Sequence, residues 1–187
     1  MATITLPVDI RLYRLVHVDA LPTMLTRGAL YAPNYTPNDG LPYRTIHNVS
    51  VQASRHSYQI WCGPRGTCHD YVPFYFGPLS VMLLNLKTGR VEGYNEGQAP
   101  LIYLTTTVQR VRDAGSRFVF SDGHGLARFT SWYDDLAQLD KVDWNLRIKR
   151  AGQSQGGSRV GHIPTTATSQ SGSTSRMVLL LKGDAND

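Results

Sequence analysis

The side chains that could do chemistry are scattered along this 187-residue sequence. Six histidines are spread from His17 to His162, and a lone histidine is more often structural or exposed than catalytic. Cys62, Cys68 and His69 lie close together, but they give at most three zinc ligands, with no fourth at a standard spacing. We therefore expect no metal site, and we expect the two thiols to stay reduced.

Short motifs for nucleotide binding or nucleophilic catalysis are also absent from the sequence, which has no P-loop, GxGxxG, GxSxG or HExxH. A formal charge of +5 favours a polyanionic partner, but on charge alone we prefer a solvated basic surface to nucleic-acid binding. The aromatic segment YVPFYF (71–76) could stack on the bases of a single strand. Core packing is the alternative, and we prefer it for Phe74 and Phe76.

Five blocks of sequence, taken in order, carry a more specific signal. They are LYRLVHVDALPTMLTRGALYAPN (12–34), YRTIHNVSVQASR (43–55), HDYVPFYFGPLSVML (69–83), RFVFSDGHG (117–125) and LAQLDKVDW (136–144). The third block is the most specific, because a generic strand has no reason to carry DYVPFYF followed by P-x-S-x-M-L. Together the blocks resemble the DarT family of DNA ADP-ribosyltransferases.

This resemblance implies an α+β fold of the ADP-ribosyltransferase type, with split central β-sheets and flanking helices around an NAD⁺ cleft. It implies transfer of ADP-ribose from NAD⁺, the co-substrate, to thymidine bases of single-stranded DNA by the toxin of a toxin–antitoxin system. The antitoxin it implies is a protein of the ADP-ribosylglycohydrolase type. Breaking the nicotinamide–ribose bond passes through an oxocarbenium-like transition state, as in glycoside hydrolysis. Positioning and electrostatics should therefore supply most of the catalysis.

The family pattern assigns the cofactor contacts to the first two blocks. By resemblance these contacts come from Arg14, Leu15, Val16, Thr23, Tyr31 and Arg55. Arg14 stands where some relatives have histidine, and its guanidinium could contact a phosphate or ribose. Segment 36–55 resembles the element that folds over NAD⁺. Arg55, at its end, matches the essential arginine of the family, and a guanidinium suits a dinucleotide because its fork binds phosphate oxygens in pairs.

The DNA contacts implied by the resemblance lie further along the chain. His124 begins the substrate-recognition loop of the family, where an imidazole could stack on a base or hydrogen-bond to it. Tyr71 and Tyr75 are the candidates for stacking on nucleobases.

The family pattern is lost after the fifth block. There the family carries an Arg/Gln-Ala-Glu-type motif, whose glutamate grips the NAD ribose and helps to deprotonate the base. The glutamates of this sequence are Glu92 and Glu96, both before that region. Three functions therefore stay open: an active DNA ADP-ribosyltransferase, a catalytically impaired pseudo-enzyme that still binds NAD or single-stranded DNA, and an RNA-modifying relative on the same fold, such as an RNA 2′-phosphotransferase-like protein.

The elements that must position these residues follow from patterning and turn chemistry. Alternation predicts a strand over 11–16, then a short helix capped by Asp19 and ended by Gly28. Pro73 makes 71–76 an edge or bulged strand. The remaining expected elements are strands at 101–104 and 118–120, helices at 47–58, 107–114 and 131–139, a helix or strand at 79–86, and a tight turn at 121–125.

Length and composition predict one domain over residues 1–150. Residues 151–187 are predicted to be a low-complexity, disordered tail, since the Gly, Ser, Thr and Gln of 151–176 bury too little apolar surface to offset the entropy of ordering. An apolar run, 177–181, follows. No apolar stretch reaches the roughly 18 residues of a membrane span, and the first residues do not resemble a secretory signal. We therefore expect a cytoplasmic protein with no membrane contact.

Overall fold

The computed structural model describes residues 9–144 and 177–183, in which strands and helices follow one another in a mixed α+β order. The strands are β1 (Arg11–His17), β2 (Gln59–Ile60), β3 (Gly66–Thr67), β4 (Tyr71–Tyr75), β5 (Leu101–Thr107), β6 (Phe118–His124), β7 (Trp132–Tyr133) and β8 (Met177–Lys182). The α-helices are α1 (Leu21–Arg27), α2 (Val49–Ser57), α3 (Val81–Lys87) and α4 (Val108–Asp113). Short 3₁₀ helices span Val18–Ala20, Pro33–Tyr35, Cys68–Asp70 and Leu136–Lys141. The α+β class predicted from the sequence is confirmed.

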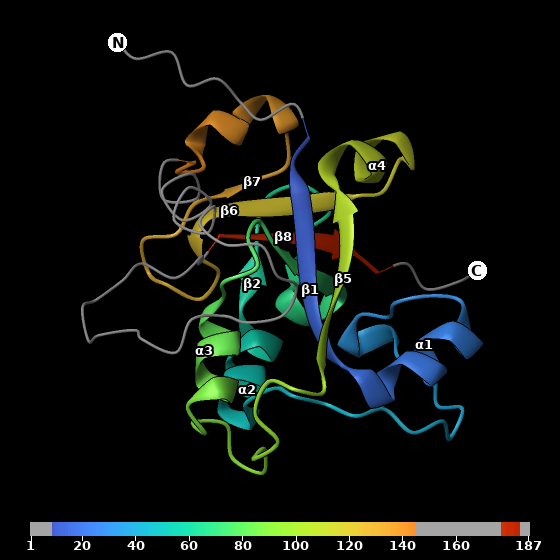
Figure 1. Cartoon of the computed structure of the whole chain (residues 1–187). Helices are drawn as coiled ribbons and strands as arrows, with labels where there is room; N and C mark the ends of the chain where they lie inside the picture. Colours follow the sequence, from blue (N-terminus) through green and yellow to red (C-terminus); the bar gives the residue numbers. More distant parts are fainter. Residues whose placement is uncertain (1–8, 145–176, 184–187) are drawn as a thin grey trace.

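Six strands form a sheet in the order β5-β1-β4-β8-β6-β7, while β2 and β3 form a separate hairpin. β1 pairs with β5 along its whole length, but the only pairing between β1 and β4 in the described residues joins Tyr13 to Tyr75. The sheet is therefore split, with β1 and β5 on one side and the remaining strands on the other. Figure 1 shows β1 and β5 running across the direction of β6 and β8.

Strand β8 lies inside the sheet. It pairs antiparallel with β4 on one side and with β6 on the other, and Leu179 and Leu180 are completely buried. The sequence assigned this apolar run to the tail beyond residue 150, so the domain extends past the predicted boundary. A continuous apolar run is typical of a strand covered on both faces. Residues 151–176, the rest of the predicted tail up to β8, lie outside the described residues.

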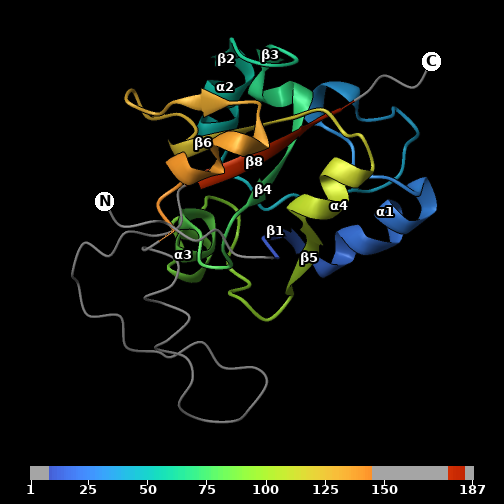
Figure 2. The same ribbon diagram turned by 90° about the horizontal axis from the view of Figure 1, so that it is seen from above.

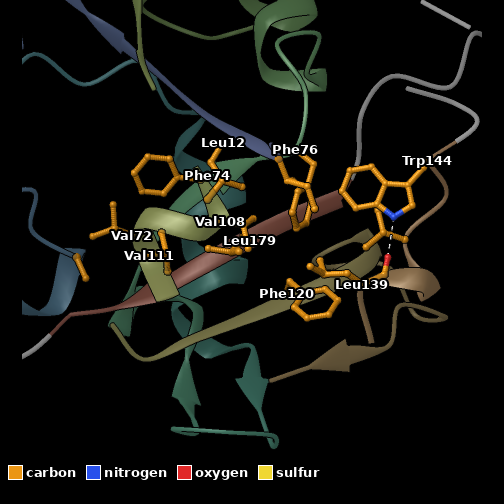
Figure 3. Close-up of a cluster of buried hydrophobic side chains, with 13 residues drawn as sticks. Leu12, Val72, Phe74, Phe76, Val108, Val111, Phe120, Leu139, Trp144 and Leu179 are labelled. Atoms are coloured by element: carbon orange, nitrogen blue, oxygen red, sulfur yellow. Dashed lines mark hydrogen bonds between the residues drawn. The ribbon is translucent and has the colours of Figure 1, made fainter. Parts of the chain in front are cut away.

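The largest core cluster fixes the relative positions of β1, β4, β6 and β8 (Figure 3). The Phe76 ring meets the ring of Trp144 edge to face at 5.6 Å and that of Phe120 at 6.3 Å. Trp144 is held in turn by its indole N–H, which donates to the Leu139 carbonyl at 2.7 Å. Phe74 and Phe76 are buried, as preferred from the sequence. Packing on this side of β4 leaves Tyr75 to face the split in the sheet.

Pro73 is accommodated in β4 by that split. The Arg14 guanidinium on β1 donates to the Pro73 carbonyl at 3.1 Å, so this side of β4 faces β1. The backbone N and O of one residue point to the same side of a strand, so the missing N–H of Pro73 also faces β1, where no ladder needs it. β4 is therefore an interior strand in the sheet order, with an edge-like side next to β1.

Helix ends largely follow the turn residues in the sequence. α1 ends at Gly28, which has a left-handed φ of 65°, as predicted. The predicted cap by Asp19 is wrong, because the N-cap of α1 is Ala20 and Asp19 lies in the preceding 3₁₀ helix. α2 begins after Asn48, whose side chain accepts from two backbone amides, and α3 shows that segment 79–86 is mainly helical.

Two local predictions between residues 121 and 139 are wrong. The predicted tight turn 121–125 is largely strand, because β6 continues to His124 and buries Ser121 completely. The predicted helix 131–139 is replaced by β7 and the 3₁₀ helix Leu136–Lys141. Pairing of Phe120 with Tyr133 in the sheet overrides the local helical pattern. In the described part of the chain no helix is both long and apolar enough to cross a membrane.

Seen from above in Figure 2, α1 and α4 lie on the side of β5, whereas α2 and the β2–β3 hairpin lie beyond β8. The long segment between α1 and α2 connects these two sides. This segment passes the split between β1 and β4, where its residues Tyr31, Tyr43 and His47 line a cavity together with residues of both strands.

Candidate functional site

A cavity of about 420 Å³ opens between β1, β4, α1, α2 and the segment that joins the two helices. Four arginines and two histidines line it: Arg14, Arg27, Arg44, Arg55, His47 and His69. Among the described residues that line the cavity there is no aspartate or glutamate. Such a lining attracts anions.

Arg14 and Arg55 are the two lining arginines that have no carboxylate partner among the described residues. Arg14 donates through Nη1 to the Pro73 carbonyl, and Arg55 donates through Nη2 to the Cys68 carbonyl at 3.3 Å. The Nε of Arg14 is buried without any hydrogen-bond partner in the described part of the chain. A buried unsatisfied donor is costly unless something binds to it. This donor set fits the oxygens of a phosphate or pyrophosphate group.

The other two arginines are neutralised and hold the segment 36–48 over the cavity. Arg27 binds the Asp39 carboxylate in a bidentate manner, with N–O distances of 2.8 and 2.7 Å. The hydrogen bonds from Arg27 hold the pKa of Asp39 at about 2. Arg44 forms an ion pair with Glu96. The segment is thus tied to α1 at one point and to the loop before β5 at another.

Glu96 also binds a buried histidine. The backbone amide of Asp19 donates to Nδ1 of His17, which leaves the proton on Nε2 to donate to Glu96 at 3.0 Å. His17 is 2% exposed, so this pair fixes the end of β1 against the loop that receives Arg44. The sequence offered no sign of this network, because its members come from three distant segments.

His47 and His69 add two titratable groups to the cavity. Burial lowers the pKa of both imidazoles, and for His69 the neighbouring charges of Arg55, His56 and His47 lower it further. His69 interacts through Nε2 with the Gln52 side-chain oxygen at 3.1 Å. Neither histidine was predicted as a site residue, although His69 begins the most specific of the five sequence blocks.

The structure brings most of the predicted cofactor residues together. Five of the six line the cavity: Arg14, Leu15, Val16, Tyr31 and Arg55. The sixth, Thr23, is 4% exposed and donates to the Pro42 carbonyl, so it fastens the segment over the cavity from α1. Tyr75 also lines the cavity, where burial raises the pKa of its hydroxyl and the charges of Arg55 and Arg14 oppose that rise.

The other two residues predicted to contact DNA lie outside the cavity. Tyr71 is completely buried, and its hydroxyl donates to the Arg65 carbonyl at 2.8 Å. A ring with no exposed face cannot stack on a base, so the structure does not support this role for Tyr71. His124 ends β6, where its Nδ1 accepts from the Leu126 amide and its carbonyl accepts from Thr130. These bonds order the start of the loop between β6 and β7.

Cys62 and Cys68 are free thiols, and burial raises the pKa of each. Within residues 9–144 and 177–183 no group of three or more metal-ligating side chains is assembled. The described residues that line the cavity offer guanidinium, imidazole and phenol groups.

An antiparallel sheet that divides beside a cationic cavity is the arrangement that the ADP-ribosyltransferase class of fold requires. The sequence matches the family model described as "ssDNA thymidine ADP-ribosyltransferase, DarT" over residues 13–157, and the chain belongs to this family. The cavity-lining residues from Arg14 to Met82 all lie within the matched range.

Individual relatives agree with this assignment. The chain is 36% identical over 140 residues to a DNA ADP-ribosyl transferase of Thermus sp. (strain 2.9), which covers 75% of this chain and 65% of that relative. It is 32% identical over 133 residues to a DNA ADP-ribosyl transferase of Escherichia coli O127:H6, which covers 71% and 60%. The chain thus spans less than two thirds of the length of these two relatives.

Solved structures give the same result. The fold matches Thermus sp. 2.9 DarT in complex with ADP-ribosylated ssDNA with a TM-score of 0.76 and 30% identity, covering 96% of this chain and 78% of that one. It matches the same protein in complex with NAD⁺ with a TM-score of 0.69 and 30% identity, covering 96% and 77%.

Proposed function

We propose that this chain binds NAD⁺ in the cavity and transfers ADP-ribose to a thymidine base of single-stranded DNA. The observation that carries the proposal is the pair of guanidinium groups of Arg14 and Arg55, which line one cavity without a carboxylate partner among the described residues. Two such donors suit the two linked phosphates of a pyrophosphate group. The relatives named above are DNA ADP-ribosyl transferases, and one of them has been solved with NAD⁺.

The residues of the cavity would act by holding the dinucleotide. Arg14 and Arg55 bind the phosphates, and the segment 36–48, tied down by Arg27–Asp39 and Thr23–Pro42, covers them and excludes water. NAD⁺ supplies the ADP-ribosyl group when bound. In the reaction the ribose–nicotinamide bond breaks and nicotinamide leaves as a neutral molecule. The ring N–H of thymine releases its proton to water, and the nitrogen bonds to the ribose carbon that nicotinamide left.

Single-stranded DNA is the acceptor that fits this chemistry. The ring N–H of thymine is hydrogen-bonded inside a duplex, and a stacked base cannot reach a recessed cavity. The Thermus relative has been solved with ADP-ribosylated ssDNA, which supports this choice. RNA is the competing acceptor, and it differs by its 2′-hydroxyl groups and by uracil in place of thymine.

A second candidate function follows from the cavity lining. No carboxylate is found among the described lining residues, although a transition state with positive charge on the ribose is stabilised by a nearby anion. If no carboxylate stabilises the ribose, the chain is an impaired enzyme that still binds NAD⁺ and single-stranded DNA. The two candidates share the binding step and differ in rate.

A nicotinamide-release assay tests the proposal. Purified protein is incubated with NAD⁺ alone, with single-stranded DNA, with duplex of the same sequence, and with RNA. We expect release that requires single-stranded DNA. NAD⁺ binding without release in any mixture selects the binding function, whereas the absence of any NAD⁺ binding by calorimetry contradicts both candidates.

We also propose the biological setting that the family resemblance implies. An ADP-ribose group on the base-pairing edge of a template thymine would prevent pairing, so the chain would act as a toxin in the cytoplasm, where NAD⁺ and DNA meet. Its partner would be an antitoxin of the ADP-ribosylglycohydrolase type that removes the modification. Co-expression of such a glycohydrolase should restore the growth of cells that produce the protein, and unchanged growth with and without it would contradict this setting.

A further inference from the structure

The loop of the β2–β3 hairpin presents an exposed tryptophan, Trp61. Ile60 at the end of β2 is 1% exposed, and the next residue, Trp61, points the other way with 76% of its surface exposed. Tryptophan has a large apolar face that is costly to leave in water, and it is enriched where proteins bind partners. The sequence analysis did not assign any role to this residue.

The hairpin is held rigidly, so Trp61 sits on a fixed support. Arg65 adopts a left-handed conformation with φ of 55°, which is uncommon for a residue other than glycine. Its carbonyl accepts from the Tyr71 hydroxyl at 2.8 Å and from Lys182 Nζ at 2.9 Å, which locks the loop. A Cβ added at Gly63 would lie 2.8 Å from the Cβ of Asp134, so the loop also fits closely against the residue after β7. Strain held in this way is typical of functional loops.

The hairpin and the cavity share one packed cluster. Tyr58, Cys62 and Tyr75 all pack against buried residues that include Ile60 and Cys68. Tyr75 lines the cavity, and the Cys68 carbonyl is the acceptor for Arg55. The Cys68 amide donates in turn to the Tyr58 carbonyl at 3.1 Å. Trp61 therefore belongs to the same packed unit that positions Arg55.

The two exposed side chains of the hairpin loop, Trp61 and Arg65, indicate the kind of partner. Asp70 and Asp134 also pack against the hairpin, but Asp70 forms an ion pair with Lys182. An exposed aromatic ring in the same loop as an exposed arginine is a combination that binds single strands, with the ring stacking on a base and the cation contacting the backbone.

We propose that Trp61 stacks on a base of the single strand that carries the target thymidine and that Arg65 contacts a phosphate of that strand. This inference rests on the proposed function, since it assumes that single-stranded DNA is the acceptor. It adds a DNA contact separate from the loop that begins at His124. The hairpin would hold the strand on the α2 side of the cavity while the target base enters.

The test is fluorescence anisotropy with a labelled, thymidine-containing single-stranded oligonucleotide. Trp61→Ala should weaken binding about tenfold, the equivalent of about 1.4 kcal/mol and within the range for one base stack. Trp61→Phe should keep most of the affinity, because a ring remains. Arg65→Asn, which tolerates the left-handed backbone, should reduce the salt slope by about 0.7. Leu25→Ala, an equally exposed apolar residue on α1, is the matched control and should change nothing.

NAD⁺ affinity, measured by calorimetry on the same proteins, distinguishes a loss of the hairpin contact with DNA from a loss of NAD⁺ binding in the cavity. It should be unchanged in every hairpin variant, since Trp61 and Arg65 do not line the cavity. Wild-type DNA affinity in Trp61→Ala overturns the inference and leaves the proposed function standing. Failure of the wild-type protein to bind single-stranded DNA at all overturns the proposed function, and the inference with it.

Discussion

Arg14 on β1 and Arg55 on α2 act on the same group, the hydroxyl of Tyr75 on β4. Burial raises the pKa of Tyr75, and the two guanidinium charges oppose that rise. Both arginines line the cavity, and both donate to backbone carbonyls rather than to carboxylates. Their charge is therefore available to a ligand, and the phenol between them offers a neutral donor beside it.

Loss of Arg55 should remove most NAD⁺ binding. A charge-assisted hydrogen bond to a phosphate contributes about 1.5–3 kcal/mol, so Arg55→Ala should weaken the affinity about 10- to 150-fold. Titration calorimetry measures this change. Arg90→Ala removes an exposed arginine outside the cavity and serves as the control. An unchanged affinity in Arg55→Ala would mean that the arginine does not bind the phosphates.

The Arg27–Asp39 pair should control the segment over the cavity in a pH-dependent way. Because the pKa of Asp39 is lowered to about 2, its contribution is fully present above the usual carboxyl pKa of about 4 and is lost as the pH falls towards 2. Hydrogen exchange of segment 36–48, corrected for intrinsic rates, should lose protection in that window. Asp39→Asn should lack the protection at every pH, and Asp113→Asn on α4 should behave as wild type. Equal protection in Asp39→Asn contradicts the prediction.

NAD⁺ binding should take up protons near pH 6.5. The pKa values of His47 and His69 are lowered in the free protein, so a nearby anionic phosphate that raises them again draws protons from the buffer. The same shifts give a contribution to folding stability that is fully present above about pH 6.5 and is lost as the pH falls through the lowered pKa values of the two histidines. Calorimetry in two buffers of different ionisation enthalpy measures the uptake. His69→Gln should reduce the proton uptake, and His124→Gln should leave it unchanged. Proton release on NAD⁺ binding would contradict the prediction.

Strand β8 should be essential to stability. Leu179 is completely buried in the main core, so Leu179→Ala should lower the free energy of unfolding by about 2–5 kcal/mol. Urea unfolding followed by tryptophan fluorescence measures the loss. Leu25→Ala, which is 72% exposed, should change stability by less than about 0.5 kcal/mol. A cost below about 1 kcal/mol for Leu179→Ala would show that β8 is dispensable.

Local signals predicted the elements whose partners lie nearby or whose ends carry turn residues. Alternation located β1, and Gly28 marked the end of α1. β8 could not be located in this way, since its partners are residues 71–75 and 118–124 and a short apolar run does not specify distant pairing. The predicted helix at 131–139 failed for the related reason that β7 pairs with β6.

The residues of the candidate site likewise fall into those that the sequence identified and those that only the fold revealed. Arg55 was found through the family resemblance, because an arginine on a weakly amphipathic helix carries no signal of its own. The Arg27–Asp39 and Arg44–Glu96 pairs were missed, since opposite charges far apart in sequence identify no partner until the fold brings them together. Tyr71 was predicted to stack on a nucleobase although it is buried, because the sequence of an aromatic strand does not show which of its rings are exposed.

The absent carboxylate leads to the final prediction. The family resemblance requires a glutamate after the fifth block, yet both glutamates of the sequence precede it, and Glu96 is bound to Arg44 and His17. Removing one such electrostatic group lowers the rate by about 10²–10³. We therefore expect the chain to add ADP-ribose to thymidine in single-stranded DNA only slowly, as measured by mass spectrometry of the oligonucleotide.

A carboxylate introduced directly before β8 should restore the rate. Met177, the first residue of β8, pairs with His124, where the substrate loop of the family begins, and Arg176 precedes it in the sequence. Arg176→Glu should therefore raise the rate about 10²-fold, whereas Arg176→Gln removes the same positive charge without supplying an anion and should not. Equal rates in the two variants would show that this position does not serve the ribose. Rapid modification by the unaltered chain would mean that another carboxylate, such as Asp140 or Asp143, already takes the role of the glutamate.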